Sequence, residues 1–178
     1  PATRVVNHDA YFAIDTAQSW VARPGSFDCP YYDGDSYLLI SELVYRAGIY
    51  HVRERLGWRE VNPNPGEYNY SYYMTNANYL QERNILISGM YHDTPIWAKP
   101  ISKLPSDLLA TYTFAKDTAT AFGDRMGNWE FWNEQDISFA PEPAWDYAAA
   151  MKAAYLGFRA ADPKRIVAHG AMCTPSKG

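Results

Sequence analysis

Cysteine is scarce in this sequence, and the residues around it form no metal-binding pattern. Among 178 residues there are two cysteines, Cys29 and Cys173, which lie far apart along the chain. No C-x-x-C pair and no cysteine–histidine cluster with the spacing of a zinc site occurs. We therefore expect no metal ion and no cofactor. The two cysteines either form one disulfide or stay free, and both alternatives remain open.

Long hydrophobic runs and clusters of basic residues are absent as well. No apolar run approaches the roughly 20 residues that a membrane helix needs. The net charge is −4 and charged residues make up 20% of the chain, without a basic cluster. We expect neither a membrane nor a nucleic acid as partner. The start at Pro1 does not resemble a signal peptide, so a mature form or a fragment is expected, with a secreted or periplasmic location favoured.

Aromatic residues, in contrast, are abundant. Six Trp and 15 Tyr raise the aromatic content to 16%, and 47% of all residues are hydrophobic. This composition is enough for one sizeable core and indicates a single domain. The aromatic rings have two interpretations, an aromatic-rich core or a cleft whose flat rings stack on the apolar faces of sugars.

Strand-like and helix-like segments alternate along the whole chain. The expected strands cover residues 11–15, 50–56, 85–91, 128–132 and 165–170. The expected helices run from an N-cap at Asp35 to Gly48 with Ile40, Leu43, Val44 and Ala47 on the apolar face, from Tyr72 to Arg83, from a cap at Ser106 to Phe122, and from about Tyr147 to Asp162. This order predicts βαβ units and a parallel sheet.

Two architectures fit such an order, a doubly wound sheet and part of a (β/α)₈ barrel. The first usually carries a Gly-rich phosphate loop, and neither G-x-G-x-x-G nor G-x-x-x-x-G-K-[ST] is present. Both folds place their chemistry at the carboxyl ends of the strands. The motifs at those ends must therefore decide between them.

The segment Asn128–Asp136 is a strand that runs directly into a polar loop. If the strand stays regular, Glu130, Trp132 and Glu134 share one face and Asn133 lies on the other. A glutamate at this place is either an exposed loop residue, which is the usual fate of Glu, or a catalytic carboxylate at a strand end.

Trp132-Asn133-Glu134 resembles the Asn-Glu signature of clan A glycoside hydrolases, with Gln135 where Pro is common. The resemblance implies a (β/α)₈ barrel in which Glu134 is the general acid/base and Asn133 holds the sugar 2-hydroxyl. It also implies an oligo- or polysaccharide substrate with β-linkages, cleaved with retention of configuration.

Two earlier strand ends support the resemblance. Val-Arg-x-x-x-x-Trp, from Val52 to Trp58, is similar to the second strand of clan A, where an Arg hydrogen-bonds the nucleophile. Arg53 is the better match, Arg55 is the alternative, and a plain salt-bridge network is the competing interpretation. The run 58–68 is similar to family 39.

The third strand leads into His92-Asp93-Thr94-Pro95-Ile96-Trp97, which is also similar to family 39. His92 and Asp93 are expected at the rim of the site, and Trp97 is expected to wall a sugar subsite or to pack in the core. His169, near the end of the fifth strand, is a weaker rim candidate.

The chain departs from the family in length. A complete barrel has eight strands in about 250 residues, and the nucleophile, about 5 Å from the acid/base in retaining enzymes, ends the seventh strand in clan A. We expect residues 1–178 to be the N-terminal part of a barrel, without the last three βα units and inactive alone. Asp15, Glu54 and Asp93 are disfavoured as substitute nucleophiles. The remaining C-terminal segment or a second copy is the expected partner.

Two other functions stay open. A non-catalytic carbohydrate-binding half barrel would use Trp58, Trp97 and Trp132 as platforms. A barrel lyase or aldolase would need a Schiff-base lysine at a strand end, but the lysines at 99, 103, 116, 152, 164 and 177 fall in expected helices or loops. Sugar identity and exo or endo action do not follow from the sequence.

Overall fold

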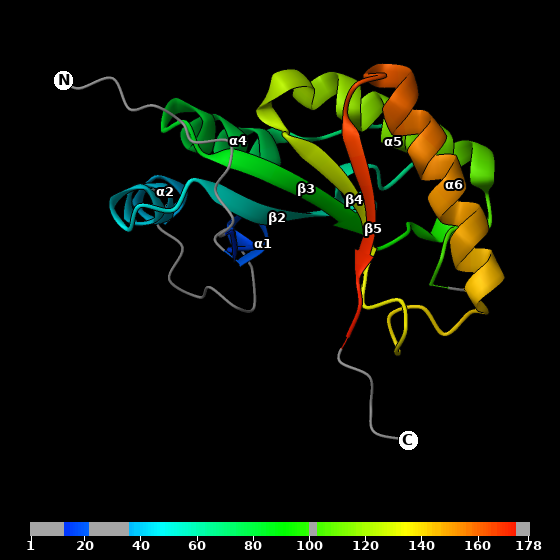
Figure 1. The fold of residues 1–178 in the computed structure, drawn as a ribbon. Coiled ribbons are helices and arrows are strands. Elements are labelled where there is room, and N and C mark those ends of the chain that lie inside the picture. Colours follow the sequence, from blue (N-terminus) through cyan, green and yellow to red (C-terminus); the bar gives the residue numbers. More distant parts are fainter. Residues whose placement is uncertain (1–12, 22–35, 100–102, 174–178) are drawn as a thin grey trace.

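The computed structural model describes residues 13–21, 36–99 and 103–173 (Figure 1). Within them, five parallel strands form one sheet in the order β1-β2-β3-β4-β5. The strands are β1 (Ile14–Asp15), β2 (His51–Gly57), β3 (Leu86–His92), β4 (Asn128–Asn133) and β5 (Ile166–Ala171). Spatial order equals chain order, whereas a doubly wound sheet reverses at a switch point. The prediction of a parallel α/β sheet belonging to a partial barrel is confirmed.

Along the chain, helices connect successive strands, and in space they lie beside the sheet (Figure 1). They are α1 (Gln18–Val21), α2 (Ser36–Arg46), α3 (Trp58–Val61), α4 (Ser71–Glu82), α5 (Leu108–Phe122) and α6 (Ala144–Ala161), with 3₁₀ turns η1 (Ile96–Ala98) and η2 (Gly123–Arg125). The four long helices were predicted, and the four-residue helices α1 and α3 were not. No helix in the described part of the chain is long and apolar enough to cross a membrane.

Two details of the helix predictions are wrong. The cap of α5 is Asp107 rather than Ser106, because the Asp107 side chain accepts the N–H of Ala110 at 2.9 Å. On α2 the buried line is Tyr37, Ser41 and Val44, whereas Leu43 is 57% exposed. The Ser41 hydroxyl tolerates burial because it donates to the Tyr37 carbonyl. The predicted N-cap Asp35 and the start of the first predicted strand lie outside the described residues.

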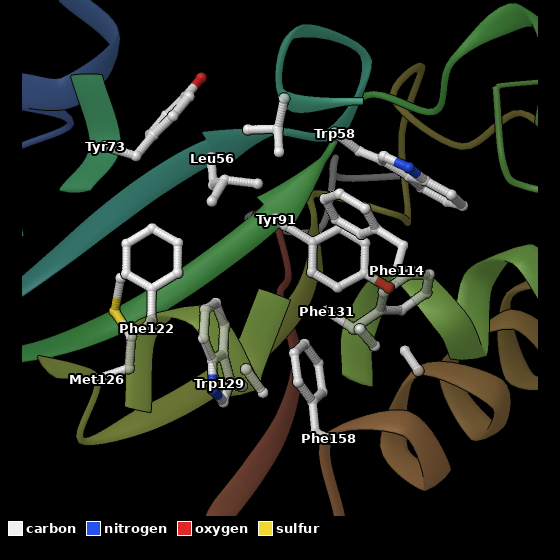
Figure 2. Packing of buried hydrophobic residues seen from close by; sticks show 14 of the residues in the cluster. Leu56, Trp58, Tyr73, Tyr91, Phe114, Phe122, Met126, Trp129, Phe131 and Phe158 are labelled. Atoms are coloured by element: carbon white, nitrogen blue, oxygen red, sulfur yellow. The ribbon is translucent and has the colours of Figure 1, made fainter. Parts of the chain in front are cut away.

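The core between sheet and helices is built largely from aromatic rings (Figure 2). Trp58 stacks on Phe114 with centroids 4.6 Å apart, and Trp129 stacks on Phe158 at 5.0 Å. Tyr91 packs edge-on against both Phe114 and Phe158. Much of the aromatic content is thus used for packing, as one of the two interpretations predicted.

The other face of the sheet is polar. On β2, Val52 and Leu56 are buried against the helices, so the alternating Arg53 and Arg55 point to the opposite face. The register pairs Arg55 with Met90, and Met90 with Glu130. Side chains of paired residues in parallel strands share a face, so these three residues lie on the side that a barrel would enclose.

Candidate active site

The end of β4 does not follow regular alternation. Trp132 and Glu134 have positive φ angles of 75° and 50°, in the left-handed region that bulky residues rarely adopt. The prediction that Asn133 lies on the face opposite Glu130 is therefore wrong, because one Arg53 guanidinium contacts both side chains. Trp132 instead packs against Phe131 and is buried.

Arg53 is the centre of a charged network on the inner face. Its Nε and Nη2 donate to the two oxygens of Glu130 at 2.8 and 2.6 Å, a bidentate pair. Nη2 also donates to Asn133 Oδ1 at 2.9 Å, and Nη1 donates to Asp15 Oδ2 at 2.7 Å. Burial alone would lower the pKa of Arg53, but the carboxylates of Glu130 and Asp15 outweigh it and raise this pKa. Arg53 therefore ties β1, β2 and β4 together.

Asp15 lies at the end of β1 between two arginines. Its Oδ2 accepts from Arg53 and, at 2.9 Å, from Arg55. Burial would raise the pKa of Asp15, but the hydrogen bonds and charges of Arg55 and Arg53 hold it below its ordinary value. The carboxylate is thus ionised and already paired with two cations.

Asn133 ends β4 in contact with this network, and Glu134 is the next residue. Asn133 is buried, and since its Oδ1 accepts from Arg53, its Nδ2 is the end of the amide left to donate elsewhere. The Glu134 backbone N–H donates to the Ala171 carbonyl at 2.7 Å, and the Glu134 carbonyl accepts from Ile137. The backbone of the predicted acid/base is therefore anchored to β5 and to its own loop.

His92 ends β3 and is buried. Its ring packs edge-on against Trp132 and Phe139, with centroids 6.2 and 6.3 Å away. Burial lowers the pKa of His92 to about 4, against an opposing effect of Asp93. The imidazole is therefore neutral at physiological pH. Asp93 itself is ion-paired with Arg59 at 2.8 Å.

The tryptophans predicted as sugar platforms are mostly built into the core. Trp58 is fully buried and donates its Nε1 to Asn62, because the chain turns into α3 directly after β2. Trp132 is 2% exposed, and half-buried Trp97 donates to the Asn62 carbonyl. The platform role of Trp58 and Trp132 is contradicted by this burial. Trp145, which was not predicted, is 73% exposed in the first turn of α6.

Two other candidates lie away from the inner face. Glu54 points to the helix side of β2, where it accepts from the backbone N–H groups of Gln18 and Ser19 and from Asn76. Burial raises the pKa of this carboxyl group. His169 pairs in register with the core residue Phe131, so it shares the helix side of the sheet. Neither residue is placed to act as nucleophile or rim ligand.

Some residues of the site were missed from the sequence. Glu130 was placed on a strand face but given no role, although a charged residue inside an apolar strand is a signal of pairing or function. Tyr147 entered the sequence analysis only as the approximate start of the last predicted helix. Trp145 lies outside the apolar face of α6, so its exposure could have been predicted from the helical periodicity.

Residues 13–21, 36–99 and 103–173 contain no group of three or more His, Cys, Asp or Glu side chains that could hold a metal ion. Cys173 is a free thiol in the structure. Its potential partner Cys29 lies outside the described residues.

The class of fold follows from comparison with solved structures, which identifies barrels of glycoside hydrolases. A family 39 glycoside hydrolase from the gut symbiont Bacteroides cellulosilyticus WH2 matches with a TM-score of 0.64 and 21% identity, over 75% of this chain and 28% of that one. The virulence factor SghA from Agrobacterium tumefaciens matches with a TM-score of 0.60 and 18% identity, over 88% and 45%. A beta-glycosidase from Pyrococcus horikoshii matches with a TM-score of 0.58 and 17% identity, over 74% and 36%.

These likenesses establish the fold, and the chain spans less than half of each of these structures. No protein-family model matches the sequence, and no curated protein matches it by sequence similarity. The comparisons thus support the fold that the resemblance to clan A glycosidases implied.

Proposed function

We propose that the chain is the acid/base-carrying part of a retaining glycoside hydrolase that acts on β-linked glycans. The observation that supports this most directly is the hydrogen bond from Arg53 to Asn133, next to Glu134 at the carboxyl end of β4. In (β/α)₈ enzymes the catalytic groups lie at this end of the strands.

In this proposal Glu134 protonates the glycosidic oxygen and then activates water. Asn133 binds the 2-hydroxyl of the sugar, a contact that strengthens in an oxocarbenium-like transition state. Arg53 holds the Asn133 oxygen, so the Nδ2 group is presented to the sugar in one orientation. This arrangement sets a donor beside the acid/base before substrate arrives.

The nucleophile is assigned to strands outside this chain. A retaining enzyme needs a second carboxylate about 5 Å from the first. On the inner face, Asp15 ends β1 and Glu130 lies within β4, whereas the clan A nucleophile ends the seventh strand. Neither carboxylate therefore fits the role of a nucleophile.

Completion of the barrel requires partners at both edges of the sheet. Exposed apolar side chains occur on the edge strands and on α2 and α6, including Ile14 on β1, Ile166 on β5 and Leu156 on α6. An open parallel edge with apolar neighbours favours burial by further βα units. We assign the burial of these edges and apolar side chains to a C-terminal barrel segment, with a second copy of the chain as the alternative.

The non-catalytic carbohydrate module receives less support. Its expected platforms Trp58 and Trp132 are buried, which leaves Trp145 as the tryptophan with a largely open ring in the described chain. The lyase or aldolase alternative is also weaker, because the described lysines lie outside the strands.

The test combines turnover with binding. The chain, alone and mixed with a C-terminal barrel segment from a family 39 enzyme, is assayed on aryl β-glycosides, and sugar binding is followed by the NMR signal of the Asn133 side-chain amide. We expect turnover in the completed form only, its loss in Glu134→Gln, and binding retained. Glu82→Gln, on an exposed side chain, is the matched control. Turnover unaffected by Glu134→Gln would overturn the proposal.

A further inference from the structure

A tyrosine hydroxyl joins β4 and β5 where β4 leaves regular geometry. Tyr147, in the first turn of α6, accepts a hydrogen bond from the Gly170 backbone N–H at 2.9 Å. It donates one to the Phe131 carbonyl at 3.1 Å, and its ring stacks on Phe131 with centroids 5.7 Å apart. Burial raises the pKa of Tyr147, so the hydroxyl keeps the proton that it donates.

This hydroxyl lies at an interruption of the strand pairing. The register joins Phe131 to His169 and Asn133 to Ala171 but skips the intervening pair, Trp132 and Gly170. Trp132 is the residue with φ of 75°. A bulky side chain in the left-handed region is costly and persists only where its surroundings fix the backbone.

The chain beyond the interruption is fixed by other bonds to β5. Glu134 N–H donates to the Ala171 carbonyl at 2.7 Å, and Ala171 N–H donates to Glu130 Oε1 at 2.8 Å. Gln135 Nε2 donates to the Gly170 carbonyl at 2.8 Å. A Cβ on Gly170 would lie 2.7 Å from the Trp132 carbonyl, so the two backbones approach here as closely as glycine permits.

We propose that Tyr147 is a positioning residue for Asn133 and Glu134. Its hydroxyl bridges the Phe131 carbonyl and the Gly170 N–H. It thereby stabilises the left-handed backbone conformation of Trp132, called the kink below, which sets the direction of Asn133 and Glu134. The kink brings Asn133 to the same side of the sheet as Glu130 and within reach of Arg53. The catalytic consequence rests on the proposed function, whereas the structural consequence does not.

The structural consequence is tested by amide hydrogen exchange, read residue by residue by NMR. In the unmodified chain we expect a protected Gly170 amide, although β5 is an edge strand of the described sheet. Tyr147→Phe keeps the ring stack and removes the hydroxyl, so the Gly170 amide should exchange at least about tenfold faster, following the loss of its acceptor. The amide signals of Asn133 and Glu134 should shift as well.

The matched control is Tyr155→Phe, because Tyr155 lies on the same helix and is 41% exposed. It should leave all three amides unchanged. A Gly170 amide that exchanges freely in the unmodified chain would overturn the inference. This outcome does not depend on whether a variant folds. The inference also fails if Tyr147→Phe changes the Gly170 exchange rate and the Asn133 and Glu134 amide signals no more than Tyr155→Phe does.

The catalytic consequence is tested in whichever form turns over an aryl β-glycoside. Tyr147→Phe should lower kcat by about tenfold to a hundredfold with KM nearly unchanged, since a small misplacement of a catalytic group has such effects. The acidic or basic limb of its pH profile should move. If Glu134→Gln leaves turnover intact, the proposed function fails and the exchange result stands. If Glu134→Gln abolishes turnover but Tyr147→Phe matches Tyr155→Phe, the positioning role is overturned.

Discussion

The Arg53 guanidinium and the Asn133 side-chain amide are joined by a hydrogen bond of 2.9 Å between Nη2 and Oδ1. The same guanidinium holds Glu130 and Asp15, so one side chain of β2 links the first and fourth strands. Local order at the end of β4 therefore depends on a residue that lies 80 positions earlier in the chain.

Arg53→Met should destabilise the fold strongly. The substitution leaves the Glu130 carboxylate, 13% exposed, without its bidentate cation. Removing one partner of a largely buried pair costs about 3 kcal/mol, because the other charge stays desolvated. Urea unfolding followed by tryptophan fluorescence measures the loss. The control is Arg46→Met, whose side chain is 74% exposed and whose surface pair contributes at most about 1 kcal/mol. Equal unfolding midpoints for the two variants would contradict the prediction.

His92 should make the fold less stable in acid. Its folded-state pKa is lowered from 6.5 to about 4, so between these values the unfolded chain binds a proton that the folded chain does not. Stability therefore falls as the pH drops from 6.5 towards 4, by up to about 3 kcal/mol from this group. The measurement is the free energy of unfolding across this range for the unmodified chain and for His92→Phe. In the variant the slope should be much reduced, and the contribution of His51, whose pKa burial also lowers, should remain. Exposed His169→Phe should keep the slope, and a slope unchanged in His92→Phe would refute the argument.

Glu54 should prove structural. Its carboxylate accepts from the N–H groups of Gln18 and Ser19, from the hydroxyls of Ser19 and Thr16, and from Asn76 Nδ2. Glu54→Ala leaves these donors buried and unsatisfied, at a cost of about 3 kcal/mol or more. Thermal or urea unfolding checks the loss, and exposed Glu82→Ala is the control, expected within about 0.5 kcal/mol. A nucleophilic role would instead appear as lost turnover at unchanged stability.

The order of elements and the place of Asn133 and Glu134 at the end of β4 could be predicted from the sequence, because periodicity and strand ends are local properties. The Asp107 cap differs from the predicted Ser106 by one residue, since both side chains suit an N-cap and only geometry chooses. The platform prediction for Trp58 failed for a different reason: the chain turns into α3 at this residue, and a one-turn helix leaves little periodic signal.

The kink at Trp132 could not be predicted from β4 alone. Regular alternation is a sound expectation for a strand, but here the conformation depends on Tyr147 from α6 and on the close approach of Gly170 from β5. Arg53, Asp15 and Glu130 likewise meet only through the register of separate strands. Such tertiary contacts decide the face that Asn133 takes.

The close packing of α5 against α6 predicts the sign of the stability change in Gly157→Ala. A Cβ on Gly157 would lie 2.9 Å from the Ala115 side chain and 3.1 Å from the backbone nitrogen of Lys116. It would lie closer still to the backbone carbonyl oxygen of Tyr112. In an exposed helix, Gly→Ala stabilises by up to about 1 kcal/mol through helix propensity. Here the methyl group meets backbone that cannot move without separating the helices, so Gly157→Ala should instead destabilise by about 2 kcal/mol. Urea unfolding of the single variant is sufficient, because a gain in stability would show that α5 and α6 do not pack as closely as the structure has them.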